Sequence, residues 1–86
     1  MERFKKKMGL LVSKVDGKFY VCYDYEVFEI NEVGARIIEL CDGKNCISDI
    51  SEKLSKKFDV DKAIVEKDVE NYITLLLSTG LIDKID

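Results

Sequence analysis

The dipeptide Asp16-Gly17 constrains the fold more than any other feature, because it separates two short apolar runs. An Asp-Gly pair strongly favours the two-residue turn that closes a β-hairpin. The run before it is residues 9–15, GLLVSKV, and the run after it is residues 18–23, KFYVCY. Both runs are rich in branched apolar or aromatic residues, as strands are. The sequence therefore predicts a pair of antiparallel strands at residues 9–15 and 18–23.

A third strand is predicted at residues 26–30, EVFEI, where charged and apolar side chains are interspersed. The two-residue period of a strand places Phe28 and Ile30 on one face and Val27 and Glu29 on the other. Short strands that carry charges are typical of the exposed edge of a sheet. We therefore expect an edge strand with Phe28 and Ile30 turned inward and with Val27 and Glu29 available to solvent.

Three helices are predicted after the strands, each beginning at a residue that suits an N-cap. These N-caps are Asn31, Ser48 and Asp61. Gly43 and Gly80 suit the left-handed position that follows a helix end. The predicted helices span residues 32–42, 48–57 and 62–78.

The apolar periodicity also predicts which side chains form the core. Its expected members are Ile30, Ile37, Leu40, Ile50, Leu54, Val69, Ile73 and Leu81. A chain of 86 residues buries only about 60–65% of its unfolded surface. Each large-to-small change in so small a core is expected to cost about 2–5 kcal/mol.

The helix predicted at residues 62–78 has more apolar surface than one buried face requires. At 100° per residue its apolar side chains span an arc of about 220°, against roughly 100° for a one-sided helix. Either the surplus flank binds a second partner, or the other helices and the strands cover both flanks. The flank in question holds Ile64, Val65, Asp68, Tyr72 and Leu75. Within it, the Asp68 carboxylate would cap a backbone donor, pair with a lysine, or lie in water at the edge.

The composition excludes several classes of function. The chain has no His, which removes Ser-His and Cys-His catalytic pairs and the commonest metal ligand. Cys22, Cys41 and Cys46 lack the spacing of a zinc site. They are interpreted as small buried apolar residues, with a metal or redox role as the alternative, and no metal or cofactor is expected. No apolar run approaches the ~20 residues that span a bilayer, so a cytoplasmic protein is expected.

The charge is distributed unevenly, although the net charge is only -3. Residues 1–8 contain four basic residues and one acidic residue, whereas residues 24–42 contain six acidic residues and one Arg. Nucleic-acid-binding proteins normally present a basic face. This chain has only a basic N-terminal tip, which is expected to be a solvated end that can be flexible.

A series of short motifs follows in one order along the chain. The motifs are Ile30-Asn31-Glu32, Ile37-Ile38-Glu39-Leu40-Cys41-Asp42-Gly43, Ile50-Ser51-Glu52-Lys53-Leu54, Asp68-Val69, Tyr72-Ile73, Leu76 and Gly80-Leu81-Ile82. Their order and spacing resemble the PqqD-like family, the peptide chaperone of pyrroloquinoline quinone biosynthesis. The wider family is the RiPP recognition element, which binds leader peptides of ribosomally made, modified peptides. The resemblance covers about residues 9–83; Lys44 keeps a basic residue common in the family, whereas Asn45-Cys46 departs from its pattern.

The resemblance implies an α+β, winged-helix-like fold in which a three-stranded antiparallel sheet is followed by three helices, all in one domain of residues 1–86. It implies that a leader peptide adds as a strand along the third strand, in a groove against the third helix. We expect this peptide to run antiparallel to residues 26–30. The peptide-binding residues would then be Tyr25, Glu26, Val27, Phe28, Glu29, Ile30, Ile64, Val65, Asp68, Tyr72 and Leu75. Tyr72 is the expected hot spot, and the acidic residues 24–42 suggest that the peptide carries Lys or Arg.

The function that the resemblance implies is delivery of a precursor peptide, without catalysis, to a modifying enzyme such as a radical-SAM maturase or to a leader peptidase. A winged-helix DNA-binding regulator is the alternative, but it requires a basic recognition helix. Residues 46–58 have a net charge of only +1 and residues 61–78 of -2. A small enzyme is a third class, although no nucleophile is paired with a base at a recognisable spacing. No nucleic-acid or membrane partner is expected, and the basic start after Met1 favours a free-standing chain over a piece of a larger enzyme.

Overall fold

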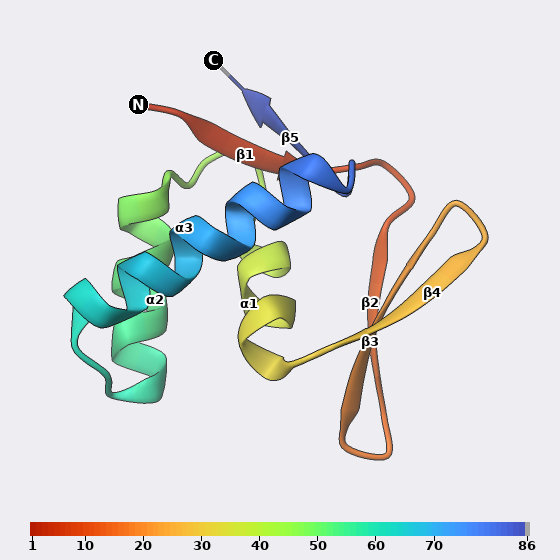
Figure 1. Ribbon diagram of the computed structural model, residues 1–86, viewed down its shortest axis with the longest axis horizontal. Helices are drawn as coiled ribbons and strands as arrows, with labels where there is room; N and C mark the ends of the chain where they lie inside the picture. Colours follow the sequence, from red (N-terminus) through yellow and green to blue (C-terminus); the bar gives the residue numbers. More distant parts are fainter. Residues whose placement is uncertain (86) are drawn as a thin grey trace.

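The computed structural model describes residues 1–85, which form two small antiparallel sheets and three helices (Figure 1). The elements in chain order are β1 (Arg3–Lys6), β2 (Leu11–Val15), β3 (Lys18–Tyr23), β4 (Glu26–Ile30), α1 (Glu32–Leu40), α2 (Ile47–Phe58), α3 (Lys62–Ser78) and β5 (Ile82–Ile85). The predicted α+β fold class is confirmed, including the three-stranded sheet followed by three helices. Within residues 1–85, no helix combines the length and the apolar character that a membrane span requires.

The larger sheet has the order β2-β3-β4, so β2 and β4 are its edges. Two-residue turns connect its strands, at residues 16–17 and 24–25. All four turn residues have positive φ: 52° and 78° in the first turn, 53° and 64° in the second. This is the turn type that matches the twist of paired strands, and it confirms the hairpin predicted at Asp16-Gly17. β2 starts at Leu11 rather than at residue 9, because Leu10 turns into the core.

The predicted N-caps of α1 and α3 are confirmed, whereas that of α2 is wrong. Asn31 Oδ1 accepts from the Gly34 N–H at 2.8 Å, and Asp61 Oδ1 accepts from the Ala63 N–H at 2.9 Å. α2 begins after Cys46 rather than after Ser48. The Asp49 carboxylate accepts the Cys46 backbone N–H at 3.2 Å, which is the second half of a capping box.

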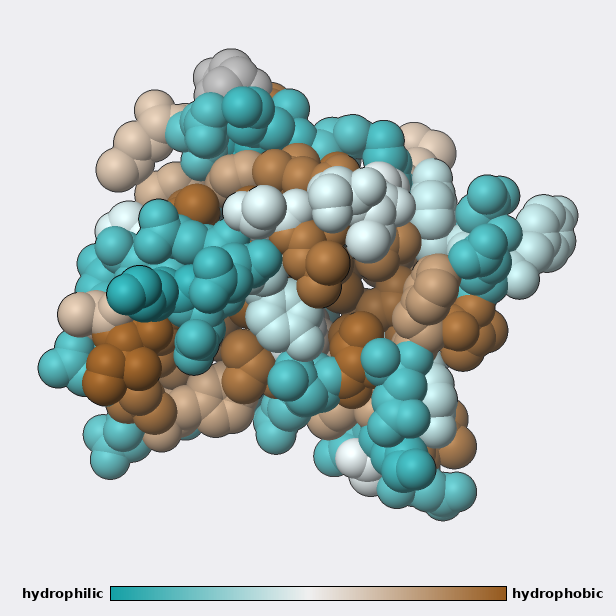
Figure 2. Space-filling view, in the orientation of Figure 1, coloured by the Kyte–Doolittle hydropathy of each residue, from teal (hydrophilic) through white to brown (hydrophobic). Residues whose placement is uncertain are grey.

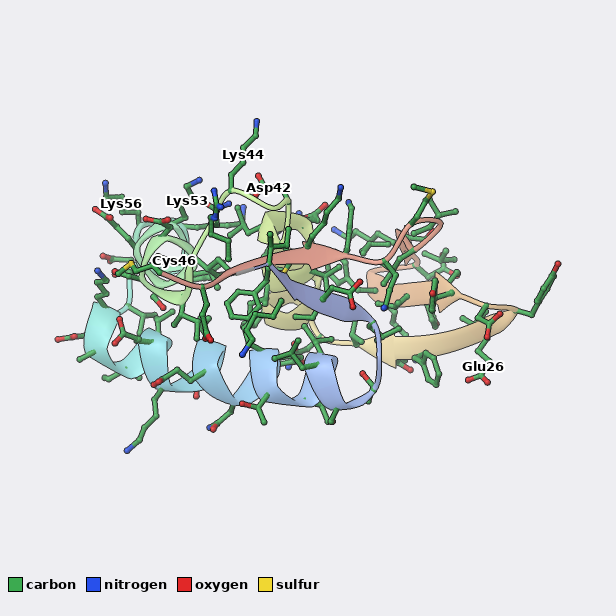
Figure 3. The ribbon with its side chains drawn as sticks, turned by 90° about the horizontal axis from the view of Figure 1, so that it is seen from above. Glu26, Asp42, Lys44, Cys46, Lys53 and Lys56 are labelled. Carbon is green, nitrogen blue, oxygen red and sulfur yellow. The ribbon has the colours of Figure 1, made fainter. Side chains whose placement is uncertain are left out.

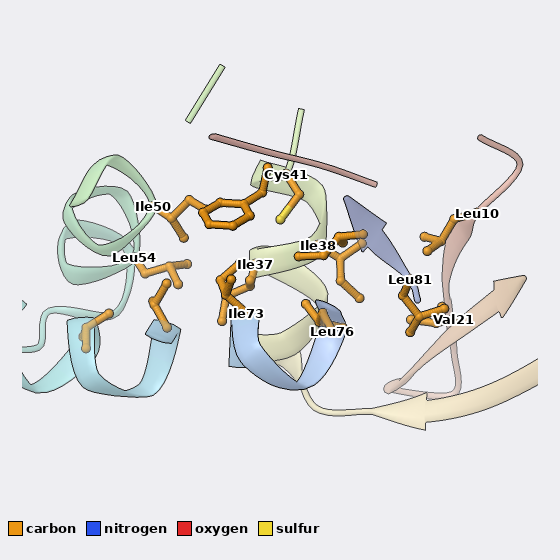
Figure 4. Close-up of a cluster of buried hydrophobic side chains, with 14 residues drawn as sticks. Leu10, Val21, Ile37, Ile38, Cys41, Ile50, Leu54, Ile73, Leu76 and Leu81 are labelled. Atoms are coloured by element: carbon orange, nitrogen blue, oxygen red, sulfur yellow. The ribbon is translucent and has the colours of Figure 1, made fainter. Parts of the chain in front are cut away.

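Most of the predicted core is buried. Ile37, Ile50, Leu54, Val69, Ile73 and Leu81 are all buried. Ile30 and Leu40 are only half-buried, because each lies at the end of its element. Further core members are Phe4, Leu10, Val21, Ile38, Cys41, Val65, Leu76 and Ile82. Figure 4 shows that side chains from α1, α2 and α3 meet at the centre of this cluster.

The three cysteines are free thiols, and two of them are buried. Cys41 is fully buried in the core, and burial raises the pKa of its thiol to about 12. Cys46 Sγ lies 3.3 Å from a carboxylate oxygen of Asp49. No group of three or more metal-binding side chains lies together in the part of the chain that the structure describes. Cys41 thus serves packing and Cys46 begins α2, whereas Cys22 is only half-buried, so the expectation of buried cysteines is wrong for Cys22.

The basic N-terminal segment is not a free end. The basic side chains of β1 are exposed, but β1 pairs antiparallel with β5, so that Arg3 lies opposite Ile85. On its other side, the Lys6 N–H donates to Cys41 O at 2.9 Å, and Phe4 O accepts from the Gly43 N–H at 2.8 Å. The cause is the Phe4 side chain, which is 2% exposed in the core. The N-terminal strand thereby holds the chain that follows α1 and the chain that follows α3.

Phe4→Ala should therefore lower the free energy of unfolding by about 3–5 kcal/mol, because it removes a buried aromatic ring and leaves a cavity. Urea unfolding followed by circular dichroism measures the change. Met8→Ala is the matched control, since the Met8 side chain is 96% exposed and its loss should change little. Equal stability of the two variants would show that β1 is not docked in solution.

Candidate functional site

The turn at residues 24–25 determines which backbone groups of β4 face away from β3. A two-residue turn is closed by hydrogen bonding between its flanking residues, here Tyr23 and Glu26. Hydrogen-bonded and non-hydrogen-bonded pairs alternate along an antiparallel ladder. Val27 and Glu29 therefore direct their N–H and C=O groups to the free edge of the sheet. These groups can pair with an added strand.

An apolar groove lies beside this free edge, between β4 and the C-terminal half of α3. Its volume is about 670 Å³. The lining residues are Phe28, Glu29, Ile30, Asn31, Tyr72, Leu75, Leu76, Thr79 and Leu81. Figure 2 shows hydrophobic side chains around a hollow between α3 and β4. Leu75 is 55% exposed and Phe28 is 44% exposed, so the groove presents large apolar surfaces to solvent.

Tyr72 is held in one position between the groove and α1. Its hydroxyl donates to Asn31 Oδ1 at 2.9 Å, and the same oxygen accepts from the Gly34 N–H. A Cβ atom at Gly34 would lie 2.6 Å from the Tyr72 hydroxyl and 2.7 Å from two ring carbons. Only glycine at this position lets the ring lie so close to α1. The side chain is thus fixed before any ligand arrives.

A second, smaller cavity lies next to Tyr72. Its volume is about 310 Å³, and its lining residues are Asn31, Val33, Asp68, Asn71 and Tyr72. Asn31 and Tyr72 also line the apolar groove, so their hydrogen-bonded pair lies between the two cavities. The second cavity is more polar, because it contains a carboxylate and two amides.

Acidic side chains surround the β4 side of the site. Asp24, Glu26 and Glu29 are exposed, and Glu32 follows at the first position of α1. In Figure 3, Glu26 points to the side on which α3 lies, whereas the labelled lysines of α2 and the preceding loop point to the opposite side. The site therefore has a negative rim, which favours a ligand that carries positive charge.

Several residues of the predicted site come together and others do not. Phe28, Glu29, Ile30, Tyr72 and Leu75 line the apolar groove. Asp68 lines the second cavity, and Val27 is 65% exposed on the edge strand beside Glu26. Tyr25 is fully exposed at the tip of the turn. Ile64 and Val65 lie outside both cavities: Ile64 is exposed, and Val65 is buried in the core.

The structure also brings residues into the groove that the sequence did not assign to it. These are Asn31, Leu76, Thr79 and Leu81. The sequence identifies Asn31 as an N-cap and as part of a short motif, but no sequence signal shows that its side-chain oxygen also accepts from Tyr72. Leu76 and Leu81 belong to the core, and their outer surfaces form part of the groove.

Comparisons with known proteins agree with one another. The family model described as "Coenzyme PQQ synthesis protein D (PqqD)" matches residues 20–82. A "PqqA binding protein" of Methylococcus capsulatus is 34% identical over 68 residues, which are 79% of this chain and 71% of that protein. The solution structure of the PqqD part of Methylobacterium extorquens PqqCD, described as a RiPP recognition element, has a TM-score of 0.80 and 21% identity and covers 93% of this chain and 87% of that chain. TbiB1 in complex with the TbiA(beta) leader peptide has a TM-score of 0.73 and 20% identity, over 92% of this chain and 94% of that chain.

The contact between Tyr72 and Gly34 predicts that Gly34→Ala changes the free energy of unfolding in opposite directions with and without the Tyr72 ring. Gly34→Ala alone should destabilise the protein by about 1–3 kcal/mol, because the new methyl group overpacks against the ring. In a Tyr72→Ala background the same change should stabilise it by about 1 kcal/mol, since Ala favours a helix over Gly. Urea unfolding of the four proteins measures both effects. An effect of the same sign in both backgrounds would contradict the close contact.

Proposed function

The chain belongs to the PqqD family, and from this premise we propose that it binds the leader segment of a ribosomally synthesised precursor peptide. The observation that carries the proposal is the apolar groove beside an unpaired strand edge. A strand edge supplies main-chain hydrogen bonds to an extended peptide, and pockets beside it select alternate side chains. The relative named for binding PqqA and the leader-peptide complex of similar fold support this proposal.

In the proposed complex the peptide adds antiparallel to β4 and hydrogen-bonds to Val27 and Glu29. One apolar side chain of the peptide enters the groove between Phe28 and Leu75. Tyr72 forms the wall of the groove and acts as the anchor, because an aromatic ring with its hydroxyl already satisfied loses little freedom on binding. The acidic rim attracts a peptide that contains Lys or Arg and mainly raises the association rate.

The same surfaces support a binding module that has no catalytic activity. Among the groove residues, Thr79 is the only one with an aliphatic hydroxyl, and that hydroxyl donates to Leu76 O at 3.1 Å. The chain contains no His that could act as its base. The bound peptide would instead pass to a partner enzyme, such as a radical-SAM maturase or a leader peptidase. A DNA-binding role is disfavoured, because the turn at residues 24–25 and β4 carry acidic residues that would face the phosphates.

The proposal predicts that Val27→Pro and Tyr72→Ala weaken peptide binding. A displayed library of random 20-residue peptides, with PqqA added as a defined member, is selected on the unmodified protein. Calorimetry then measures the affinity of an enriched peptide for each variant. Tyr72→Ala should weaken binding about 30-fold, which is the ~2 kcal/mol of a hot spot, and Val27→Pro about 10-fold, because it removes a main-chain donor.

Lys14→Pro is the matched control. Lys14 also directs its backbone N–H to a free edge of the sheet, but this edge belongs to β2 and lies away from the groove. It should bind the peptide like the unmodified protein, provided that circular dichroism shows all three variants to be folded. The proposed function would be contradicted if selection enriched no peptide, or if all variants bound the peptide with the affinity of the unmodified protein.

A further inference from the structure

The cavity beside Asp68 contains a carboxylate that pairs with no other side chain among residues 1–85. Asp68 is the only charged residue that lines it. Its carboxylate makes no hydrogen bond or ion pair with any other residue in the range 1–85. The side chain is exposed, so water solvates it in the free protein. A carboxylate at the mouth of a cavity is available to pair with a cationic ligand.

The other walls of this cavity suit a long basic side chain. The Asn71 amide oxygen can accept a second hydrogen bond from an ammonium or guanidinium group. Val33 is half-buried and supplies an apolar wall for the methylene groups of Lys or Arg. Tyr72 also lines this cavity, and an aromatic ring favours a nearby cation. A phosphate or a carboxylate of a ligand would instead be repelled by Asp68.

The distance between the two cavities fits one extended peptide. Asp68 and Leu75 lie seven residues apart on α3, which corresponds to about 10 Å along the helix axis. An extended chain covers that distance in about three residues. Side chains on one face of a strand recur at even spacing. The two peptide side chains that enter the two cavities are therefore about two or four residues apart.

The direction of β4 determines which of the two cavity-filling side chains comes first along the peptide. β4 runs from Glu26 to Ile30 and continues into Asn31, which lines both cavities. Of the two cavities, only the apolar groove extends back along β4 to Phe28, whereas the Asp68 cavity extends forward to Val33. A peptide antiparallel to β4 therefore passes the Asp68 cavity first and the apolar groove second.

We infer that the Asp68 cavity is a second subsite that selects a Lys or Arg about two or four residues before the apolar anchor of the bound peptide. This inference rests on the proposed peptide-binding function. Tyr72 and its hydrogen bond to Asn31 separate the two subsites, so the spacing between the basic and apolar residues is fixed by the protein.

The test selects a displayed library of random 12-residue peptides on three proteins: the unmodified chain, Asp68→Asn and Glu70→Gln. Glu70 is a matched control, because it is an exposed carboxylate of α3 that lies about 200° around the helix from Asp68. The unmodified protein and Glu70→Gln should enrich Lys or Arg before an apolar residue at the stated spacing. Asp68→Asn should keep the apolar preference and lose the basic one.

A second measurement tests the contact directly. In one enriched peptide the basic residue is replaced by norleucine, which keeps the aliphatic stem and removes the charge. This change should weaken binding to the unmodified protein and to Glu70→Gln about tenfold and leave binding to Asp68→Asn nearly unchanged.

The outcomes separate the inference from the proposed function. Selection of no peptide at all overturns both. Apolar enrichment without a basic preference, or a basic preference that persists in Asp68→Asn, overturns the subsite and leaves the peptide groove intact. A basic residue that follows the apolar one overturns the inferred order and indicates a peptide parallel to β4.

Discussion

The site depends on the close contact of the Tyr72 ring with Gly34. The missing Cβ at Gly34 lets the ring lie against the first turn of α1, and the Tyr72 hydroxyl then reaches Asn31. Asn31 ends the connection from β4 and caps α1 through the same oxygen. One amide side chain therefore satisfies a helix N-terminus and ties α3 to the end of the edge strand. The two walls of the groove keep their separation because of this contact.

The acidic rim solves a problem that an exposed strand edge creates. An unpaired edge beside apolar surface can pair with another copy of the same strand and lead to aggregation. Two copies of β4 would each bring Glu26 and Glu29 to the new pair, and their like charges would oppose it. A peptide that carries Lys or Arg is instead attracted by these carboxylates. The same charges thus disfavour the wrong partner and favour the proposed one, as specific interfaces commonly do.

Local signals in the sequence predicted the three-stranded sheet, α1 and α3, because turns and caps are determined by a few neighbouring residues. The N-cap of α2 was predicted wrongly, since the Asp49 carboxylate enables Cys46, a residue of no capping preference, to begin the helix. β1 and β5 gave no signal, because they pair residues at opposite ends of the chain and each has only four residues. For the site, the angular position around α3 identified Tyr72 and Leu75. It could not show that Ile64 and Val65 lie too far along the helix axis to reach β4.

The turn at residues 24–25 explains how the edge strand can present hydrogen-bonding groups and pockets at once. Tyr25 adopts a φ of 64°, a left-handed conformation that costs a non-glycine residue about 1–2 kcal/mol. In return, the two-residue turn fixes the phase of the ladder, so that Phe28 and Ile30 hydrogen-bond to β3 while their side chains line the groove. Val27 and Glu29 then offer their backbone groups to a peptide at the free edge of the sheet. One extra residue in the turn would shift this register and exchange the two sets. The strained turn is therefore a requirement of the site rather than an incidental feature of the loop.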